Sequence, residues 1–199
     1  ATRSVAIGVN ALKLNASGND NTAIGYSALE NNSTGSQNTA IGVSSLMANS
    51  SGGYNVAIGY SCLERNTTGI LNTAIGHSSL YNNLNGRSNT AIGKSALERN
   101  ISGNNNIATG SYSLFNNQTG QDNIALGKSA LERNINGSNN IAIGTSSLFN
   151  NQSTSNNISI GHESQLNNLS GERNTTLGVQ ALFVNSYGND NIAIGYNAF

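Results

Sequence analysis

Side chains that could perform catalysis or hold a metal are few in this sequence. It contains two histidines, His77 and His162, one cysteine, Cys62, and nine acidic residues. Hydrolytic triads, paired carboxylates and metal sites all need several such groups within a few ångströms of one another. The sequence has no local motif of these kinds, so any chemistry depends on the elements that position these residues.

A repeat of 17 residues positions all of them. The fifth position of the repeat is Gly in all twelve copies, and the twelfth is Asn in all eleven copies that reach it. Spacing without insertions is typical of a solenoid, in which each coil stacks in register on the last. We predict one repeat domain over residues 1–199, with a degenerate first coil from Ser4. The regular coils begin at Asn21, Asn38, Asn55, Asn72, Asn89, Asn106, Asn123, Asn140, Asn157, Asn174 and, for the partial last coil, Asn191.

The repeat is too short for a pair of helices and fits a β-coil. Positions 2 to 4, as in Thr22–Ile24, alternate in character, and positions 7 to 9, as in Ser27–Leu29, do likewise. The sequence therefore predicts an all-β parallel β-solenoid of about twelve coils with two short strands per coil. Small Ala and Ser residues at positions 3 and 8 are expected to let backbones or partner chains approach closely.

The invariant residues are predicted to be structural. Glycine at position 5 is expected to supply a positive φ at a sharp turn, as is glycine at position 15. Asparagines at positions 1 and 12 are expected to stack at the strand spacing of ~4.8 Å as amide ladders. The predicted turn glycines are Gly25, Gly42, Gly59, Gly76 and Gly93. The predicted ladder residues are Asn21, Asn38, Asn55, Asn72, Asn89, Asn106, Asn32, Asn49, Asn66 and Asn83.

This register keeps the titratable residues apart. His77 and His162 both occupy position 6 but lie five coils from each other, roughly 24 Å at the strand spacing. Asp20, Asp122 and Asp190 share position 17, also in distant coils. We therefore predict that the chain is not an enzyme and has no catalytic residue, bound metal or cofactor.

Position 10 alternates between Glu and a large apolar residue, which makes the duplicated unit 34 residues long. Alternation doubles the separation of the carboxylates and lets the rings cover neighbouring stems. Arg65, Arg99 and Arg133 directly follow three of the glutamates and are expected to neutralise the stripe. The two alternating sets are Glu30, Glu64, Glu98 and Glu132, and Met47, Tyr81, Phe115 and Phe149. The candidate surface contacts are Met47, Tyr81, Phe115, Phe149, Glu64, Arg65, Glu98 and Arg99.

Position 12 also begins an Asn-x-Ser/Thr sequon in eight copies. Asparagine persists at Asn83, Asn134 and Asn185, where the sequon is broken, so a turn role is favoured over glycosylation. Both interpretations remain open from the sequence. The eight sequon asparagines are Asn15, Asn32, Asn49, Asn66, Asn100, Asn117, Asn151 and Asn168.

Overall composition excludes several partners. The chain has 9 basic and 9 acidic residues, so it offers no electrostatic footprint for nucleic acid or an anionic membrane. No apolar run is long enough for a membrane span, and Cys62 has no partner for an intrachain disulfide. Because the sequence starts without Met, we expect a processed product or an excerpt of a longer protein.

The phrases SVAIG, NTAIG, NVAIG and NIAIG resemble the head repeat of YadA-like trimeric autotransporter adhesins. The longer form NTAIGYSALENNSTG resembles repeats of phage and giant-virus tail fibres and of bacterial surface fibres. The resemblance covers the whole chain and implies a left-handed β-roll assembled as a parallel homotrimer. The adhesin repeat is shorter, so the extra residues are expected to enlarge the outer turn. No neck, coiled coil or membrane anchor of that family is visible in the sequence.

These observations predict an extracellular structural or adhesive fibre module on a cell or virion surface. It would present a repetitive surface for attachment or filament formation, with no receptor identified on the host surface or matrix. Each coil has few large apolar residues, which favours a homo-oligomer. Neither end carries a distinctive capping sequence, so we also expect end-to-end continuity, either covalent or assembled. One alternative is a viral tail-fibre shaft that positions a receptor-binding tip. A minor alternative is ice binding through Thr22, Thr39, Thr73 and Thr90.

Overall fold

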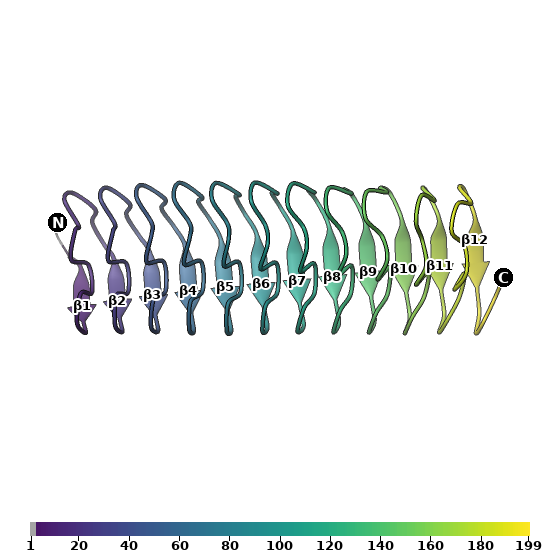
Figure 1. Cartoon of the computed structure of the whole chain (residues 1–199), viewed down its shortest axis with the longest axis horizontal. Coiled ribbons are helices and arrows are strands. Elements are labelled where there is room, and N and C mark those ends of the chain that lie inside the picture. Colours follow the sequence, from purple (N-terminus) through teal and green to yellow (C-terminus); the bar gives the residue numbers. More distant parts are fainter. Residues whose placement is uncertain (1–2) are drawn as a thin grey trace.

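Residues 3–199 are described by a computed structural model in which each repeat closes one coil of an elongated stack (Figure 1). Each coil contributes one three-residue strand, and consecutive strands pair in parallel to form one twelve-stranded sheet. The register places equivalent positions opposite each other, as in Thr73↔Thr90 and Ala74↔Ala91. The predicted all-β parallel solenoid is therefore confirmed. The strands are β1 (Val5–Ile7), β2 (Thr22–Ile24), β3 (Thr39–Ile41), β4 (Val56–Ile58), β5 (Thr73–Ile75), β6 (Thr90–Ile92), β7 (Ile107–Thr109), β8 (Ile124–Leu126), β9 (Ile141–Ile143), β10 (Ile158–Ile160), β11 (Thr175–Leu177) and β12 (Ile192–Ile194).

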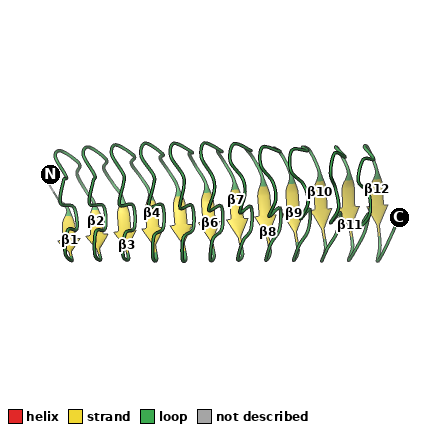
Figure 2. Cartoon of the chain, viewed as in Figure 1, coloured by secondary structure: helices red, strands yellow, loops and turns green. Residues whose placement is uncertain are grey.

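The prediction of a second strand in each coil is wrong. Positions 6 to 11 run as consecutive turns, drawn as green loops in Figure 2. In the coil that starts at Asn21, Ser27 and Leu29 have φ angles of 55° and 50°. A strand needs negative φ throughout, so left-handed residues at positions 7 and 9 exclude it. The apolar alternation at these positions reflects which side chains are buried, and the backbone that carries them forms consecutive turns and not an extended strand.

The turn segment is nevertheless hydrogen-bonded from coil to coil. The Ser27 N–H donates to the carbonyl of Val9 in the preceding coil at 2.9 Å, and the Leu29 N–H donates to Ser45 in the following coil at 3.0 Å. A left-handed conformation costs a non-glycine residue about 1–3 kcal/mol. Bonds to both neighbouring coils, together with burial of the leucine side chain, offset that cost.

The core is a narrow column inside the coils. In the coil 72–88, Ala74, Ser79 and Leu80 have no exposed surface, and equivalent residues are buried in neighbouring coils. Of the two alternatives expected for the small residues at positions 3 and 8, close approach of partner chains is therefore wrong, and close approach of backbones within the coil fits their burial. These residues are small because they share a thin interior with one leucine per coil.

The apolar column is interrupted in the coil 157–173. Gln165 stands at the position held by Leu148 and Leu182 in the coils on either side, and it is fully buried. Its Nε2 donates to Oδ1 of Asn157 at 3.4 Å, whereas its Oε1 has no hydrogen-bond partner. The buried apolar residues consequently form two clusters, one that ends at Leu148 and one that begins at Ala181.

Replacing Gln165 by leucine is expected to raise the free energy of unfolding by about 2 kcal/mol. An unpartnered buried oxygen costs about 1–3 kcal/mol, and a buried leucine contributes about 1.5–3 kcal/mol. Urea denaturation followed by far-ultraviolet circular dichroism measures the change. Gln180→Leu is the control, because Gln180 has a similar φ of 55° but is only half-buried and should change stability by under about 0.5 kcal/mol. An unchanged or lower stability of Gln165→Leu would contradict the argument.

No helix forms among the described residues, and none of them belongs to a helix that could cross a membrane.

Candidate functional surfaces

Two ladders of asparagine side chains run through the coil interior. At position 12, Nδ2 of Asn49 donates to Oδ1 of Asn32 at 2.7 Å, and Nδ2 of Asn66 donates to Oδ1 of Asn49 at 2.8 Å. At position 1, the Asn55 backbone N–H and Nδ2 both donate to Oδ1 of Asn38, at 3.0 and 3.2 Å. The ten asparagines predicted to form ladders are all fully buried. The ladder prediction is confirmed, with the added finding that the amides lie in the core.

The carbonyl of the glycine at position 15 joins the two ladders. Nδ2 of Asn21 and Nδ2 of Asn32 donate to the Gly35 carbonyl at 2.9 and 2.8 Å. Gly35 is not among the residues with positive φ, so the predicted reason for glycine at this position is wrong. A Cβ at the equivalent Gly69 would lie 2.6 Å from Nδ2 of Asn83. Glycine is favoured here because the ladder amides occupy the space of a side chain. The one exception is the coil 140–156, where buried Thr154 holds this position and its carbonyl accepts from Asn140 and Asn151.

Glycines at position 5 do adopt the predicted positive φ. The angle lies between 127° and 140° at this position in every described coil, including Gly25, Gly42, Gly59, Gly76 and Gly93. A Cβ on Gly76 would also lie 2.7 Å from the carbonyl oxygen of Gly93 in the next coil. Both the backbone conformation and the close stacking of coils therefore require glycine.

The burial of position 12 rules out glycosylation of seven of the eight sequon asparagines in the folded coil; the eighth, Asn15 in the first coil, is half-buried. Asn32, Asn49 and Asn66 have no exposed surface, and their Nδ2 atoms donate hydrogen bonds inside the ladder. An oligosaccharide on Nδ2 would need both the space and the hydrogens that the ladder uses. The Asn of each sequon is thus explained by its place in the ladder, and the Ser or Thr two residues later belongs to the turn that follows.

The histidines and the cysteine lie in separate places within the described residues 3–199. His77 and His162 are exposed, and the His77 ring stacks on Tyr60 with 5.1 Å between ring centroids. Burial raises the pKa of the Cys62 thiol, whose sulfur contacts the carbonyl of Gly76. Within residues 3–199, no three His, Cys, Asp or Glu side chains lie close enough to bind one metal ion.

The aspartates of position 17 take part in exposed contacts between adjacent coils. Asp20 pairs with Arg3 at 2.8 Å, and Asp190 pairs with Arg173 at 2.7 Å. The hydrogen bond from Arg173 holds the pKa of Asp190 below its usual value. Asp122 instead accepts a hydrogen bond from Asn105 at 3.0 Å. These contacts connect coils along one edge of the rod.

The outer surface of the sheet carries an apolar strip. Positions 2 and 4 of the repeat point outward in every strand, and position 3 is buried from β2 to β12, so the strip formed by positions 2 and 4 runs the whole length of the sheet. Its central members Ile58, Ile75 and Ile92 are 37%, 37% and 39% exposed. The strip contains only Thr, Val, Ile and Leu, so it is uncharged from β1 to β12. We call these two columns the outer strip.

The arginines at position 11 contact aromatic rings of the following coil. The guanidinium of Arg65 lies 5.2 Å from the Tyr81 ring centroid, and that of Arg99 lies 4.9 Å from the Phe115 centroid. Arg133 and Phe149 repeat this geometry at 4.9 Å. Among the described residues these three arginines take part in none of the ion pairs. The arginines therefore balance the charge of the adjacent glutamates along the stripe without forming ion pairs with them.

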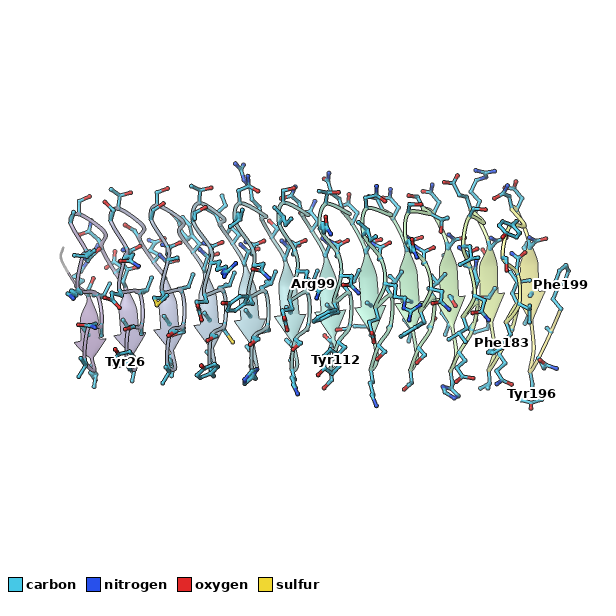
Figure 3. The ribbon with its side chains drawn as sticks, in the orientation of Figure 1. Tyr26, Arg99, Tyr112, Phe183, Tyr196 and Phe199 are labelled. Carbon is cyan, nitrogen blue, oxygen red and sulfur yellow. The ribbon has the colours of Figure 1, made fainter. Side chains whose placement is uncertain are left out.

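The alternation of Glu and aromatic residues at position 10 explains why the arginines contact rings and not carboxylates. The ring of Tyr81 lies in the coil that follows Arg65. The Tyr81 hydroxyl donates a hydrogen bond to Glu64 at 3.3 Å. The ring thus separates the arginine above its face from the carboxylate at its edge. Glu98, which directly precedes Arg99, is half-buried. Met47 is also half-buried, and the coil before it has Asn31 at position 11 instead of an arginine. Figure 3 shows Arg99 at mid-height of the rod in this view, with Tyr26 and Tyr112 along the lower edge.

Two grooves between these arginines were not predicted from the sequence. The first is lined by Arg65, Arg99, Asn82, Leu84, Ile101 and Gln118 and has a volume of about 340 Å³. The second is lined by Arg99, Arg133, Asn116, Gln118, Ile135 and Gln152 and has a volume of about 380 Å³. The signal for them was the combination of Arg at position 11 with Leu, Ile or Gln at position 13.

Comparison of the chain with protein-family models, curated proteins and solved structures found no match.

Proposed function

We propose that this chain is a non-catalytic rod module of an extracellular fibre, in which copies associate side by side through the outer strip. The observation that supports it is the strip itself, because an uncharged apolar face along the whole sheet is an unusual surface for a solitary soluble chain. Burial of Ile58, Ile75 and Ile92 against a second copy would remove that apolar surface from water. Three parallel chains are the arrangement that the resemblance to trimeric adhesins implies.

The stacking of the coils favours a structural role. Each strand pairs in register with the next from β1 to β12. The position-12 ladder is continuous from Asn15 to Asn168, and the amide-to-amide bonds at position 1 run from Asn38 to Asn191. A linear assembly of this kind grows in length without enlarging its core, because each coil contacts only its neighbours. Such a rod suits a shaft that holds other groups away from a surface. A viral tail-fibre shaft must also hold other groups away from a surface, and it is the alternative function for this module.

The test is the oligomeric state of a strip variant. Wild-type protein is expected to sediment as a stable oligomer at micromolar concentration, whereas Ile75→Asp with Ile92→Asp should give a folded monomer. A charge in a buried apolar interface is unfavourable unless it is paired. The matched control is Leu84→Asp, since Leu84 lies in the same coil as Ile75 and is 41% exposed outside the strip. A wild-type monomer, or equal dissociation by the control, would reject the proposal.

Ice binding is a second candidate that uses the same strip. Thr22, Thr39, Thr73 and Thr90 lie on the outward column of the sheet at regular strand spacing, as a planar ice-binding face requires. The column is interrupted by Val56 and, from Ile107 onward, consists of Ile except at Thr175. Thermal hysteresis by the purified monomeric chain would favour this function, and its absence together with oligomer formation would favour the fibre.

A further inference from the structure

We propose that the two grooves along position 11 bind an extended acidic polysaccharide that carries one carboxylate per disaccharide. This inference goes beyond the rod function and does not depend on association through the outer strip. It rests on four features of the surface between Arg65 and Arg133: the spacing of the cations, their orientation, the amides between them and the local charge balance.

The first feature is the spacing of the guanidinium groups. Arg65, Arg99 and Arg133 occupy the same position in alternate coils, so neighbouring members lie about 10 Å apart along the axis at the strand spacing of ~4.8 Å. Arg99 lines both grooves, which makes them one channel with three cations. A linear polymer with one anionic group on every second sugar presents charges at a comparable interval.

The second feature is that the arginines are held in place with donors left over. Arg99 lies over the Phe115 ring, and its Nη1 donates to Oδ1 of Asn116 at 2.9 Å. Arg133 is held in the same way by Phe149 and by Asn150 at 2.9 Å. A guanidinium carries five N–H donors in a planar fork that suits a carboxylate. Each exposed arginine therefore presents a pre-oriented anion-binding group at little entropic cost.

The third feature is the surface between the cations. Gln118 lines both grooves, and Asn82 and Gln152 line one each, so amide donors and acceptors alternate with arginines. Leu84, Ile101 and Ile135 add half-exposed apolar surface, at 41%, 39% and 38%. Sugar rings offer hydroxyl groups at their edges and C–H groups on their faces. Amides beside aliphatic side chains match both.

The fourth feature is the charge balance, which argues against nucleic acid. Glu64, Glu98 and Glu132 directly precede the three arginines, so the stripe as a whole is neutral. A duplex carries one phosphate charge per about 1.7 Å, and its binding depends on a concentrated positive patch. Widely spaced arginines flanked by carboxylates favour a polymer whose own charges are widely spaced.

The experiment measures binding of the full chain to fluorescently labelled hyaluronan, which has one carboxylate per disaccharide. Dextran serves as the uncharged probe, and heparin and single-stranded DNA serve as densely charged probes. We expect binding of hyaluronan that strengthens with fragment length until all three arginines are spanned, weaker binding of heparin and DNA, and none of dextran. Arg99→Gln should weaken hyaluronan binding about tenfold, because it removes the charge shared by both grooves.

Two further variants decide the interpretation. Arg87→Gln removes an equally exposed charge outside these two grooves and should leave the affinity unchanged. Arg99→Lys keeps the charge without the fork and should retain part of the affinity. Thermal unfolding confirms that each variant is folded. Equal weakening by Arg87→Gln, tighter binding of DNA or heparin than of hyaluronan, or no hyaluronan binding would each overturn the proposal.

Discussion

Gly76→Ala is expected to lower the free energy of unfolding by about 2–6 kcal/mol. The φ of Gly76 is 130°, a conformation that L-residues with a side chain rarely adopt and that costs them about 1–3 kcal/mol. The added Cβ would also lie 2.7 Å from the oxygen and 2.8 Å from the carbon of the Gly93 carbonyl. These are backbone atoms of a coil whose position is fixed by the sheet register. The clash can be removed only by separating two coils, which costs about 1–3 kcal/mol more.

The matched control is Gly53→Ala. Gly53 has no positive φ, and its added Cβ would meet only backbone atoms of Ser36, the nearest at 3.0 Å. Equivalent positions in other coils hold Ile70, Arg87 and Asn104, so this part of the coil accommodates side chains. Denaturation with urea should therefore show a small change for Gly53→Ala and a large one for Gly76→Ala. Similar midpoints for both variants would mean that coil stacking tolerates a methyl group at position 5.

The repeat length, the first strand and the asparagine ladders could be predicted from the sequence. Exact spacing forces equivalent residues into register, so any column of identical amides must stack on itself. Gly76 and its equivalents were predicted for the same reason, because an invariant glycine in a tight coil implies a backbone position closed to other residues. These predictions depend on periodicity alone and need no knowledge of side-chain packing.

The predictions that failed depended on three-dimensional packing. Ser27 and Leu29 alternate like strand residues, but their backbone is left-handed and makes its hydrogen bonds to both adjacent coils. Gly35 was assigned to a positive φ, whereas the space beside it is filled by Asn32 and Asn49. Arg99 was considered beside its neighbour Glu98, and its contact with a ring one coil further on was missed. Each error came from judging a residue by its sequence neighbours alone, although contacts with adjacent coils, 14 to 18 residues away, also determine its role.

Asn83→Ala is expected to lower the free energy of unfolding by about 2–4 kcal/mol. Nδ2 of Asn83 donates to Oδ1 of Asn66 at 2.8 Å and to the Gly86 carbonyl at 3.0 Å, and Oδ1 of Asn83 accepts from Asn100 at 2.7 Å. The Gly86 carbonyl still accepts a hydrogen bond from Asn72 in the variant. Oδ1 of Asn66 is therefore the acceptor that loses its donor from the next coil of the ladder. An unpartnered buried acceptor costs about 1–3 kcal/mol, and the void left by the amide adds to it.

Asn83→Asp separates hydrogen bonding from packing in the same ladder, because the two side chains have nearly the same shape. An ionised carboxylate has no hydrogen for Asn66 or Gly86 and would be fully buried, so its pKa in the folded state should rise above the ordinary value of about 3.9. The variant should be most stable below that ordinary pKa, where the protonated acid donates one hydrogen bond. Stability should then fall as pH rises towards the folded-state pKa and stay low above it. Urea denaturation of Asn83→Asp at a series of pH values, with Asn83→Ala as the titration-free reference, measures this dependence. Parallel profiles for the two variants would mean that the ladder contributes through packing volume and not through its amide hydrogen bonds.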